Sequence, residues 1–460
     1  MRTGQVSLAF LGLQAFASIP MRKNSGTLNI QSKLSGGYGP LIDDPNGIMN
    51  LPKGFSYDII SRQGDRMSDG FFVPGAPDGM ATFEAPGNKI IIIRNHEVSA
   101  GDITKGPFGN NLELLNNAVA KKLYDYGNGK LPCMGGTTTI LYNPATKKVE
   151  EQYLSLAGTI RNCAGGPTPW NSWISCEEDM STDIGHLEKF HGYAFEVPAQ
   201  VQPELFTPEP IRAMGRFNHE AVAVDPKTGI VYQTEDRIDG LIYRYIPKEN
   251  GNLQKGGKLQ ILSIKGQSSF STRNWIRDDN TMEARKKYDV EWLDINNINP
   301  IGDDLRIRGR KKGAAIFARG EGMWFGTDEV YFACTNGGKH SFGQIFRYTP
   351  SIKEGQPEEI NDPGTLELFI DSDRTDLMQS CDNLTVGANG DLVICEDLPT
   401  PRIVGVSMEG KIYHIAKNVG FKSEFAGATF SPDGKILFVN IQDAGLTIAI
   451  NGPWGDPKIG

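Results

Sequence analysis

The sequence lacks an excess of basic residues and contains few histidines, and each shortage excludes a common kind of site. Of its 460 residues, 47 are Lys or Arg and 55 are Asp or Glu, which gives a formal net charge of −8. Nucleic-acid-binding proteins normally carry a basic excess or a basic stripe. The 6 histidines show no metal-ligand spacing, so a histidine-rich zinc site is not expected. An acidic protein that handles an anionic substrate needs local cations, and bound metal ions supply them.

Paired cysteines and familiar catalytic motifs are also absent. The 6 cysteines form no Cys-x-x-Cys pair, which leaves structural zinc and thioredoxin chemistry with little support. Their even number permits disulfides in an exported protein but does not require them in a chain of this length. No Gly-x-Ser-x-Gly, Walker loop or His-Glu-x-x-His occurs, so the chemistries that these motifs serve are poorly supported.

No apolar run is long enough to span a bilayer, and the mature chain is therefore expected to be soluble. Residues 1–20 resemble a signal peptide, with one Arg, an apolar stretch and the small-x-small sequence Ala15-Phe16-Ala17. A disordered or docked N-terminal arm is the alternative. We predict a signal segment over residues 1–20, leading to export, and a single domain over residues 21–460.

Helical periodicity is scarce, and a strand-sized pattern recurs in its place. A turn rich in Gly, Pro, Asp or Asn precedes a short apolar segment, which ends in acidic or amide residues. This pattern occurs six times, over residues 85–97, 165–178, 225–236, 321–336, 387–397 and 431–442. A second, aromatic-rich type lies between these copies, over residues 137–144, 191–198, 240–247, 343–350 and 410–417.

The two alternating strand types predict an all-β fold, a six-bladed β-propeller with helical or loop insertions. A pair of β-sandwiches is the structural alternative. Unequal gaps between the copies place the insertions chiefly between residues 245 and 320. Residues 282–294 are expected to form a short helix, and residues 110–127 form the best amphipathic helix candidate.

The acidic ends of the repeated strands predict a metal site. In a propeller, equivalent strands of all blades radiate from one channel, so equivalent positions converge. Carboxylates brought together repel one another, and a multivalent cation relieves the repulsion. Oxygen ligands favour calcium, magnesium or manganese. In the alternative interpretation, these acids are plain turn residues that bind no metal. The residues at these positions are Glu97, Glu177, Glu178, Glu235, Asp236, Glu396 and Asp397.

A repeated tripeptide adds a further carboxylate. Asn95-His96-Glu97 recurs as Asn218-His219-Glu220, and strand alternation turns each His away from the face shared by Asn and Glu. The histidines are therefore expected in the core or behind the ligands. Glu220 and Glu235 lie at hairpin distance, so both could reach one metal ion.

Four more residues are candidates for the site. Cys163 lies in the glycine-containing loop RNCAGG and is the candidate thiolate ligand, with a plain loop cysteine as the alternative. Cys176 and Cys395 are expected in the blade interior. Arg319 is interpreted as a residue that clamps the substrate phosphate, and Glu321 as a metal ligand. Alternatively, the two residues form a surface ion pair. Asp382 is a further ligand candidate, with a turn as its alternative.

Taken together, these motifs resemble the PhoX family of alkaline phosphatases. The resemblance implies a six-bladed propeller that holds two Fe³⁺ ions and three Ca²⁺ ions around a bridging oxide. It also implies phosphomonoester substrates and export to the periplasm or beyond by the twin-arginine pathway, although only Arg2 precedes the apolar stretch. The segments that carry the resemblance are residues 161–179, 216–237, 318–325, 381–397 and 427–442.

The family resemblance also implies individual roles. The residues expected to bind iron, or to lie at the boundary between iron and calcium, are Cys163, Glu220, Glu235 and Asp382. The residues expected to bind calcium are Glu177, Glu178, Glu321 and Glu396. Arg319 and Asn162 are expected to contact the substrate, with Glu220 and Glu235 at the catalytic centre. No nucleic acid, membrane span or partner chain is implied, and a monomer is expected.

The expected reaction is in-line displacement at phosphorus, in which metals and Arg319 neutralise the developing charge. A calcium-dependent propeller that hydrolyses lactones or phosphodiesters is the rival enzyme. A propeller whose ions are only structural is the non-enzymatic rival.

Overall fold

The computed structural model describes residues 36–118, 120–181, 185–455 and 457. Contacts divide the chain into residues 1–32 and residues 33–460, and every described residue belongs to the second unit. The predicted signal segment and the predicted domain boundary after residue 20 lie outside the described residues. No described helix is both long and apolar enough to cross a membrane.

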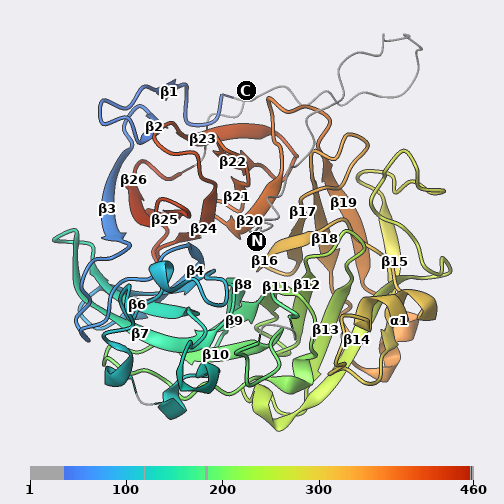
Figure 1. Cartoon of the computed structure of the whole chain (residues 1–460). Coiled ribbons are helices and arrows are strands. Elements are labelled where there is room, and N and C mark those ends of the chain that lie inside the picture. The colour runs from blue at the N-terminus through green and yellow to red at the C-terminus, as the bar shows by residue number, and fades with distance from the viewer. Residues whose placement is uncertain (1–35, 119, 182–184, 456, 458–460) are drawn as a thin grey trace, which may run out of the picture. The chain divides into compact units, whose positions relative to one another are not determined.

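The described chain is built from five antiparallel sheets, which confirms the all-β prediction. Figure 1 shows the sheets arranged around a common centre, as in a propeller. The first sheet has the order β4-β5-β6-β7 and the second β10-β9-β8. Their bounds are β4 Pro77–Ala85, β5 Lys89–His96, β6 Gly135–Asn143, β7 Lys148–Thr159, β8 Asn162–Pro167, β9 Ser172–Glu177 and β10 Ala194–Pro198.

The third sheet has nine strands, in the order β11-β12-β13-β14-β15-β19-β18-β17-β16. Its bounds are β11 His219–Val224, β12 Val231–Glu235, β13 Ile242–Pro247, β14 Gly257–Ile264, β15 Lys287–Asp294, β16 Gly320–Phe325, β17 Val330–Cys334, β18 Gln344–Thr349 and β19 Thr365–Asp371. The sequence predicts six separate blades, and the structure differs here. Strand β15 pairs with β14 through residues 290–294 and with β19 through residues 287–289, so one strand joins two four-stranded runs.

The last two sheets bring the two ends of the described chain together. Their orders are β1-β2-β23-β22-β21-β20 and β24-β25-β26-β3, so N-terminal strands complete sheets formed by the C-terminal part. The bounds are β1 Leu41–Ile42, β2 Met49–Pro52, β3 Ser56–Arg62, β20 Cys381–Val386, β21 Leu392–Glu396, β22 Arg402–Val406, β23 Ile412–Asn418, β24 Phe425–Phe430, β25 Ile436–Ile441 and β26 Leu446–Asn451.

One edge strand lies innermost in each of the four smaller sheets and in each run of the nine-stranded sheet, and these six strands form a closed ring. Strand β4 contacts β8, β8 contacts β11, β11 contacts β16, β16 contacts β20, β20 contacts β24, and β24 contacts β4. Six chain segments that are far apart in the sequence therefore meet around one axis, as the propeller prediction requires.

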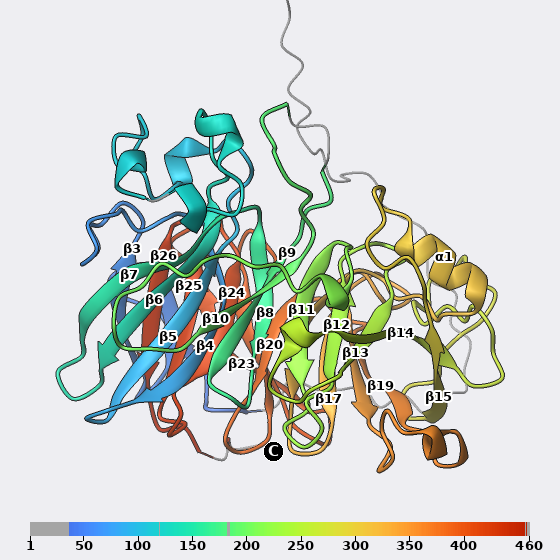
Figure 2. The same cartoon turned by 90° about the horizontal axis from the view of Figure 1, so that it is seen from below.

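Both helix predictions differ from the structure. The prediction for residues 282–294 is wrong, because most of this segment is strand β15, whose Tyr288, Val290 and Trp292 alternate along one face. Within residues 110–127 the described residues form only short 3-10 turns, among them η2 (Leu115–Asn117) and η3 (Ala120–Lys122). This segment belongs to the insertion of residues 97–134, which lies over one face of the sheets (Figure 2). The remaining 3-10 helices are η1 Ile103–Lys105, η4 Gly127–Gly129, η5 Arg212–Met214, η6 Leu253–Lys255 and η7 Pro357–Asn361.

The one α-helix among the described residues, α1 (Leu305–Lys312), was not predicted. Its sequence LRIRGRKK contains no apolar stripe, and only Leu305 and Gly309 are buried. Gly309 packs so closely that a Cβ there would lie 2.5 Å from Leu241 Cδ1. The helix therefore depends on tertiary contact rather than on a periodic pattern.

Aromatic packing joins the first sheet to the last. The ring of Phe438 on β25 meets that of Tyr142 on β6 edge to face, with centroids 5.5 Å apart. Both side chains are fully buried, in a cluster that also contains Met80 and Ile92. This contact closes the ring of sheets between its first and last members.

We predict that Phe438→Ala lowers the free energy of unfolding by about 3–5 kcal/mol, because the lost ring leaves a cavity between two sheets. Ile352→Ala, at a side chain that is 84% exposed, should change it by less than about 0.5 kcal/mol. Denaturant unfolding of both variants tests this packing, and equal stability of the two would contradict it.

Candidate metal centre

Every innermost strand carries a β-bulge near its start. In β8, Asn162 pairs with Glu177 and Gly165 pairs with Ser175, so Cys163 and Ala164 stand opposite a single residue. A bulge of this kind redirects a side chain out of the regular alternation. The six bulges lie between Pro77 and Met80, Asn162 and Gly165, His219 and Val222, Gly320 and Met323, Cys381 and Leu384, and Ala426 and Thr429.

The two residues inside each bulge follow one rule. The first is a potential metal ligand in five strands, and the second is mostly small. Small residues are needed where neighbouring innermost strands approach, since a Cβ on Gly79 would lie 2.6 Å from Ala164 Cα. We call the five potential ligands the inner set: Asp78, Cys163, Glu220, Glu321 and Asp382, with Gly427 at the sixth position.

The inner set forms one continuous cluster of donor atoms. Three groups occur whose donor atoms all lie within 4.8 Å of one another: Asp78–Glu97–Cys163, Cys163–Glu178–Glu220 and Glu220–Glu321–Asp382. Cys163 and Glu220 each belong to two groups, so the three groups share members. The Cys163 Sγ lies 3.6 Å from Asp78 Oδ2. Side chains from strands β4, β8, β11, β16 and β20 thus meet at one place.

A second layer of carboxylates surrounds this cluster, mostly at the positions just after the second strand of a sheet. Gln442 Nε2 joins the layers by donating to Asp78 Oδ2 at 2.6 Å and to Glu97 Oε2 at 2.8 Å. Glu424 interacts electrostatically with Asp78 and Glu97. We call this layer the outer set: Glu97, Glu178, Asp236, Asp397 and Glu424.

Two arginines lie over the carboxylates. Arg319 donates to Asp236 from Nε at 2.9 Å and from Nη2 at 2.8 Å, and its Nη2 is 2.7 Å from Glu321. Arg161 Nη2 pairs with Glu178 and, at 2.7 Å, with Glu97. The two side chains are 34% (Arg161) and 30% (Arg319) exposed, so they border solvent while the acids beneath are buried.

Both arginines have the same unusual backbone. Arg161 has φ +46° and Arg319 has φ +55°, and each stands two residues before the inner-set residue of its strand. Left-handed backbone in a non-glycine residue costs about 1–3 kcal/mol and clusters at functional sites. Ala76 (φ +44°) and Ser380 (φ +49°) stand at the same position before Asp78 and Asp382, so left-handed backbone belongs to this repeated position and places Arg161 and Arg319 at equivalent points of their strands.

The electrostatics favour bound cations. Burial, then Glu321 and Glu178, raises the pKa of Glu220 well above its ordinary range. Burial and Glu97 do the same for Asp78, and burial and Glu424 for Asp382. Both carboxylate oxygens of Glu220 and Oδ1 of Asp78 are buried without a hydrogen-bond partner among the described residues. Since buried polar atoms are nearly always satisfied, these oxygens fit metal ligands well.

The structure does not bring three other predicted ligands, Glu177, Glu235 and Glu396, into this cluster. In the paired register Glu177 faces Asn162, Glu235 faces His219 and Glu396 faces Cys381. Each of these glutamates therefore lies on the same face of its sheet as the residue before the bulge. The inner-set residue follows one position later in that strand, and its side chain points to the other side.

Each of these three carboxylates has other partners. Glu177 accepts from the N–H groups of Ile160, Gly192 and Tyr193 and from His191. Glu235 accepts from Tyr243 and Leu241, and burial raises its pKa to about 7. Glu396 is bound by Arg402 and the Gln379 N–H.

Asn162 is also turned from the cluster. Its Oδ1 accepts from Thr159 Oγ1 at 2.6 Å, and its Nδ2 donates to Ser175 Oγ at 2.8 Å. The side chain is fully buried, so no contact with a substrate follows from its position.

Residues expected in the interior are found there. Cys176 and Cys395 are buried in hydrophobic clusters, and none of the six cysteines forms a disulfide. His96 binds Gly75 O and Thr138 Oγ1, whereas His219 binds Gly215 O and stacks on Phe217. The histidines of the repeated tripeptide thus support the strands behind Glu97 and Glu220.

Sequence reasoning missed Asp78 and Arg161. The signal for Asp78 is a short pattern, a ligand followed by a small or amide residue, as in Asp78-Gly79 and Glu321-Gly322. Arg161 could have been found because it precedes Cys163 by two residues, as Arg319 precedes Glu321.

Comparison with known proteins agrees with this site. The family described as alkaline phosphatase PhoX matches residues 36–445. The chain belongs to the PhoX family. This membership confirms the predicted family and the prediction of a phosphatase. No match was found among curated proteins.

Solved structures give a similar picture for the fold. Pseudomonas fluorescens PhoX, described in complex with vanadate as a transition state analogue, has 18% sequence identity and a TM-score of 0.64, over 91% of this chain and 98% of that chain. Weaker matches include virginiamycin B lyase from Staphylococcus aureus, with 12% identity and a TM-score of 0.38 over 86% of this chain and 99% of that chain. A gluconolactonase of Xanthomonas campestris has 9% identity and a TM-score of 0.37, over 88% of this chain and 98% of that chain.

We predict that the metal-free protein loses stability as pH rises. Burial, together with Asp236 and Glu97, raises the pKa of Glu178 from 4.5 to about 8. Between these values the folded chain holds a proton that the unfolded chain has lost, so the free energy of unfolding falls with pH. Thermal unfolding of chelator-treated protein should show a Tm that decreases between pH 4.5 and 8.

Added Ca²⁺ should remove this decrease, because bound cations favour ionised carboxylates. Glu178→Gln should reduce the slope of Tm against pH, whereas the exposed Glu358→Gln should leave it unchanged. A Tm that rises with pH in the chelated protein would contradict the assignment.

Proposed function

We propose that this PhoX-family enzyme hydrolyses phosphomonoesters at a polynuclear iron–calcium centre on the propeller axis. The observation that carries the proposal is the repeated bulge, which points five potential ligands at one place. The nine-stranded sheet then counts as two blades joined by β15, which gives six blades. We extend to this chain the vanadate complex of the P. fluorescens protein, since bound metal ions and the two arginines would give the axial site the positive charge that a phosphate-like ligand needs.

The two sets of residues differ in the metal that they suit. The inner set contains the Cys163 thiolate, a soft ligand that favours iron over calcium. The outer set contains only carboxylates, which suit calcium. We therefore assign Fe³⁺ to the inner set and Ca²⁺ to the outer set, with two and three ions and a bridging oxide as in the family resemblance. When bound, these ions would supply positive charge to the phosphate oxygens and activate the attacking oxygen.

The chain's own residues orient the substrate. Asp236 holds Nε and Nη2 of Arg319, while Nη1 takes part in no hydrogen bond among the described residues. Arg161 is held by the backbone carbonyl of Glu178 at Nε and by the carboxylates of Glu178 and Glu97 at Nη2. Two guanidinium groups fixed at the edge of the cluster can thus donate to the equatorial phosphate oxygens as charge develops.

The cellular setting is part of the proposal. Export to the periplasm or the cell exterior, by the twin-arginine pathway, would expose the site to external phosphoesters. We also propose that the protein acts as a monomer. The rival function, hydrolysis of lactones or phosphodiesters, is separated by comparing turnover of p-nitrophenyl phosphate with that of bis(p-nitrophenyl) phosphate and a lactone. Faster turnover of either rival substrate would overturn the proposal.

We predict that Arg319→Ala lowers kcat for p-nitrophenyl phosphate by about 100-fold, because a fixed transition-state donor is lost. Arg374→Ala removes an exposed Arg–Asp pair elsewhere and should leave kcat unchanged. Metal content is measured beside the rate. Full activity of Arg319→Ala with normal metal content would contradict the role of this side chain.

A second prediction separates the two glutamates of neighbouring strands. Glu220→Gln should lose bound metal and activity together, because Glu220 belongs to two of the ligand groups and both of its oxygens lack a hydrogen-bond partner. Glu235→Gln should keep its metal, because Glu235 belongs to none of these groups and its Oε2 is bound by Tyr243 and Leu241. Elemental analysis of both variants decides, and equal metal loss would favour the sequence-based prediction that both are ligands.

A further inference from the structure

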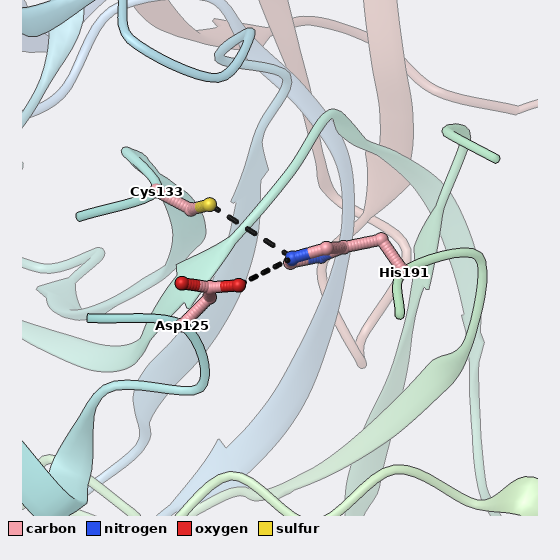
Figure 3. A group of neighbouring side chains, drawn as sticks. All are labelled: Asp125, Cys133 and His191. Atoms are coloured by element: carbon pink, nitrogen blue, oxygen red, sulfur yellow. Dashed lines mark hydrogen bonds and ion pairs between the residues drawn. The ribbon is translucent and has the colours of Figure 1, made fainter. Parts of the chain in front are cut away.

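Three metal-binding side chains meet outside the central cluster. Asp125, Cys133 and His191 are fully buried, and their donor atoms lie within 4.8 Å of one another. His191 Nε2 is 3.3 Å from Asp125 Oδ2 and 3.9 Å from Cys133 Sγ (Figure 3). The figure shows the thiol and the carboxylate converging on the same ring nitrogen.

Two of the three residues come from one rigid loop of the insertion of residues 97–134. The Asp125 N–H donates to Gly158 O, which fixes Asp125 to the end of β7, and the Cys133 N–H donates to Asp125 O. Backbone N–H groups of Gly127, Glu188 and Lys189 hold the Asp125 carboxylate in place. The ligands are therefore oriented by the fold itself.

The other nitrogen of His191 is held by a carboxylate. His191 Nδ1 lies 2.6 Å from Glu177 Oε1, and in a metal-bound site Nδ1 would keep its proton and donate it to this oxygen. This leaves Nε2 for a ligand bond. A histidine that donates to a carboxylate from one nitrogen and binds a metal through the other is the usual arrangement at protein metal sites.

The donor set and spacing suit three positions of a small tetrahedral ion, whose fourth ligand would be a water molecule. Bonds of about 2.0–2.1 Å to nitrogen and 2.3 Å to sulfur place these two atoms about 3.5 Å apart. The observed 3.9 Å between Nε2 and Sγ needs little contraction. Thiolate, imidazole and carboxylate together select a transition metal and not calcium.

We propose that Asp125, Cys133 and His191 bind one divalent transition metal ion of the zinc class, at a site distinct from the central cluster. Glu177 belongs to this site as the residue that orients His191. The ion would join the insertion to the segment just before β10, and the His191–Glu177 contact would extend the link to the end of β9, next to Glu178 of the outer set. Its role would be structural, because the site is sealed from solvent.

Binding must displace protons. Burial raises the pKa of the Cys133 thiol. For His191, burial acts against the charged form, but Glu177, Asp125 and Cys133 raise its pKa to about 12. The ion therefore replaces the thiol proton and the Nε2 proton, and both leave to solvent. A metal-free site would be a protonated imidazole between two carboxylates, which is the competing state.

The first test is the zinc content of the full-length protein and three cysteine variants, after incubation with Zn²⁺ and removal of free ion. Cys133→Ser should lose one zinc ion per chain relative to the unmodified protein. Cys163→Ser, in the central cluster, and Cys176→Ser, in the hydrophobic core, should keep that ion. Iron and calcium should be unchanged in Cys133→Ser, which separates this site from the proposed catalytic centre.

Three outcomes would overturn the proposal. These are a protein that binds no zinc, a Cys133→Ser variant that retains it, and loss of zinc only in Cys163→Ser. If Cys133→Ser fails to fold, the folded Cys163→Ser protein still decides. Loaded with Co²⁺, the Cys163→Ser protein should show the near-ultraviolet charge-transfer band of a cobalt thiolate. This band would report Cys133, because among the described residues Cys133 and Cys163 are the cysteines that belong to a group of potential ligands. Absence of that band would refute the site.

Discussion

The structure depends on a cluster of acids at the axis, most of them buried or half-buried, whose negative charges repel one another. Nine carboxylates gather at the axis, and Arg161 and Arg319 supply only two positive charges in return. Two like charges about 5 Å apart repel by about 3 kcal/mol at an effective dielectric constant of 20. The nine are Asp78, Glu97, Glu178, Glu220, Asp236, Glu321, Asp382, Asp397 and Glu424. Multivalent ions would supply the missing charge, and metal binding would then stabilise the axis as well.

A single backbone device creates this cluster. A bulge at the start of each innermost strand turns one side chain toward the axis, and a small residue after it lets neighbouring strands approach. The sheet count can vary around this ring, as the strand β15 that joins two runs shows. The bulges are unaffected, because they lie on strands that contact each other directly.

The periodic part of the fold was predictable from sequence, whereas the exact face of the site was not. The repeated apolar segments correspond to strands such as β5, β12 and β25, because buried strands leave a clear apolar run. The innermost strands, such as Asn162–Pro167, are short and rich in small residues, so they give no such signal. The site residues Cys163, Glu220, Glu321 and Asp382 were named through motifs.

The other predicted ligands stand one residue away from side chains that face the axis. The sequence analysis took the acid at the end of the second strand of a sheet as an axial residue, which gave Glu177, Glu235 and Glu396. In the structure, the residue after each of these acids, or the residue inside the bulge of the first strand, faces the axis. A one-residue change of register moves a side chain to the opposite face. Glu177 has a different task, which only the tertiary contact with His191 reveals.

The most direct test of the account is anomalous diffraction from crystals of the native protein, recorded on both sides of the iron absorption edge. The account predicts iron peaks beside Cys163 Sγ and the Glu220 carboxylate, within the ring of innermost strands. Iron absent from that ring, or found only away from these two side chains, would contradict it.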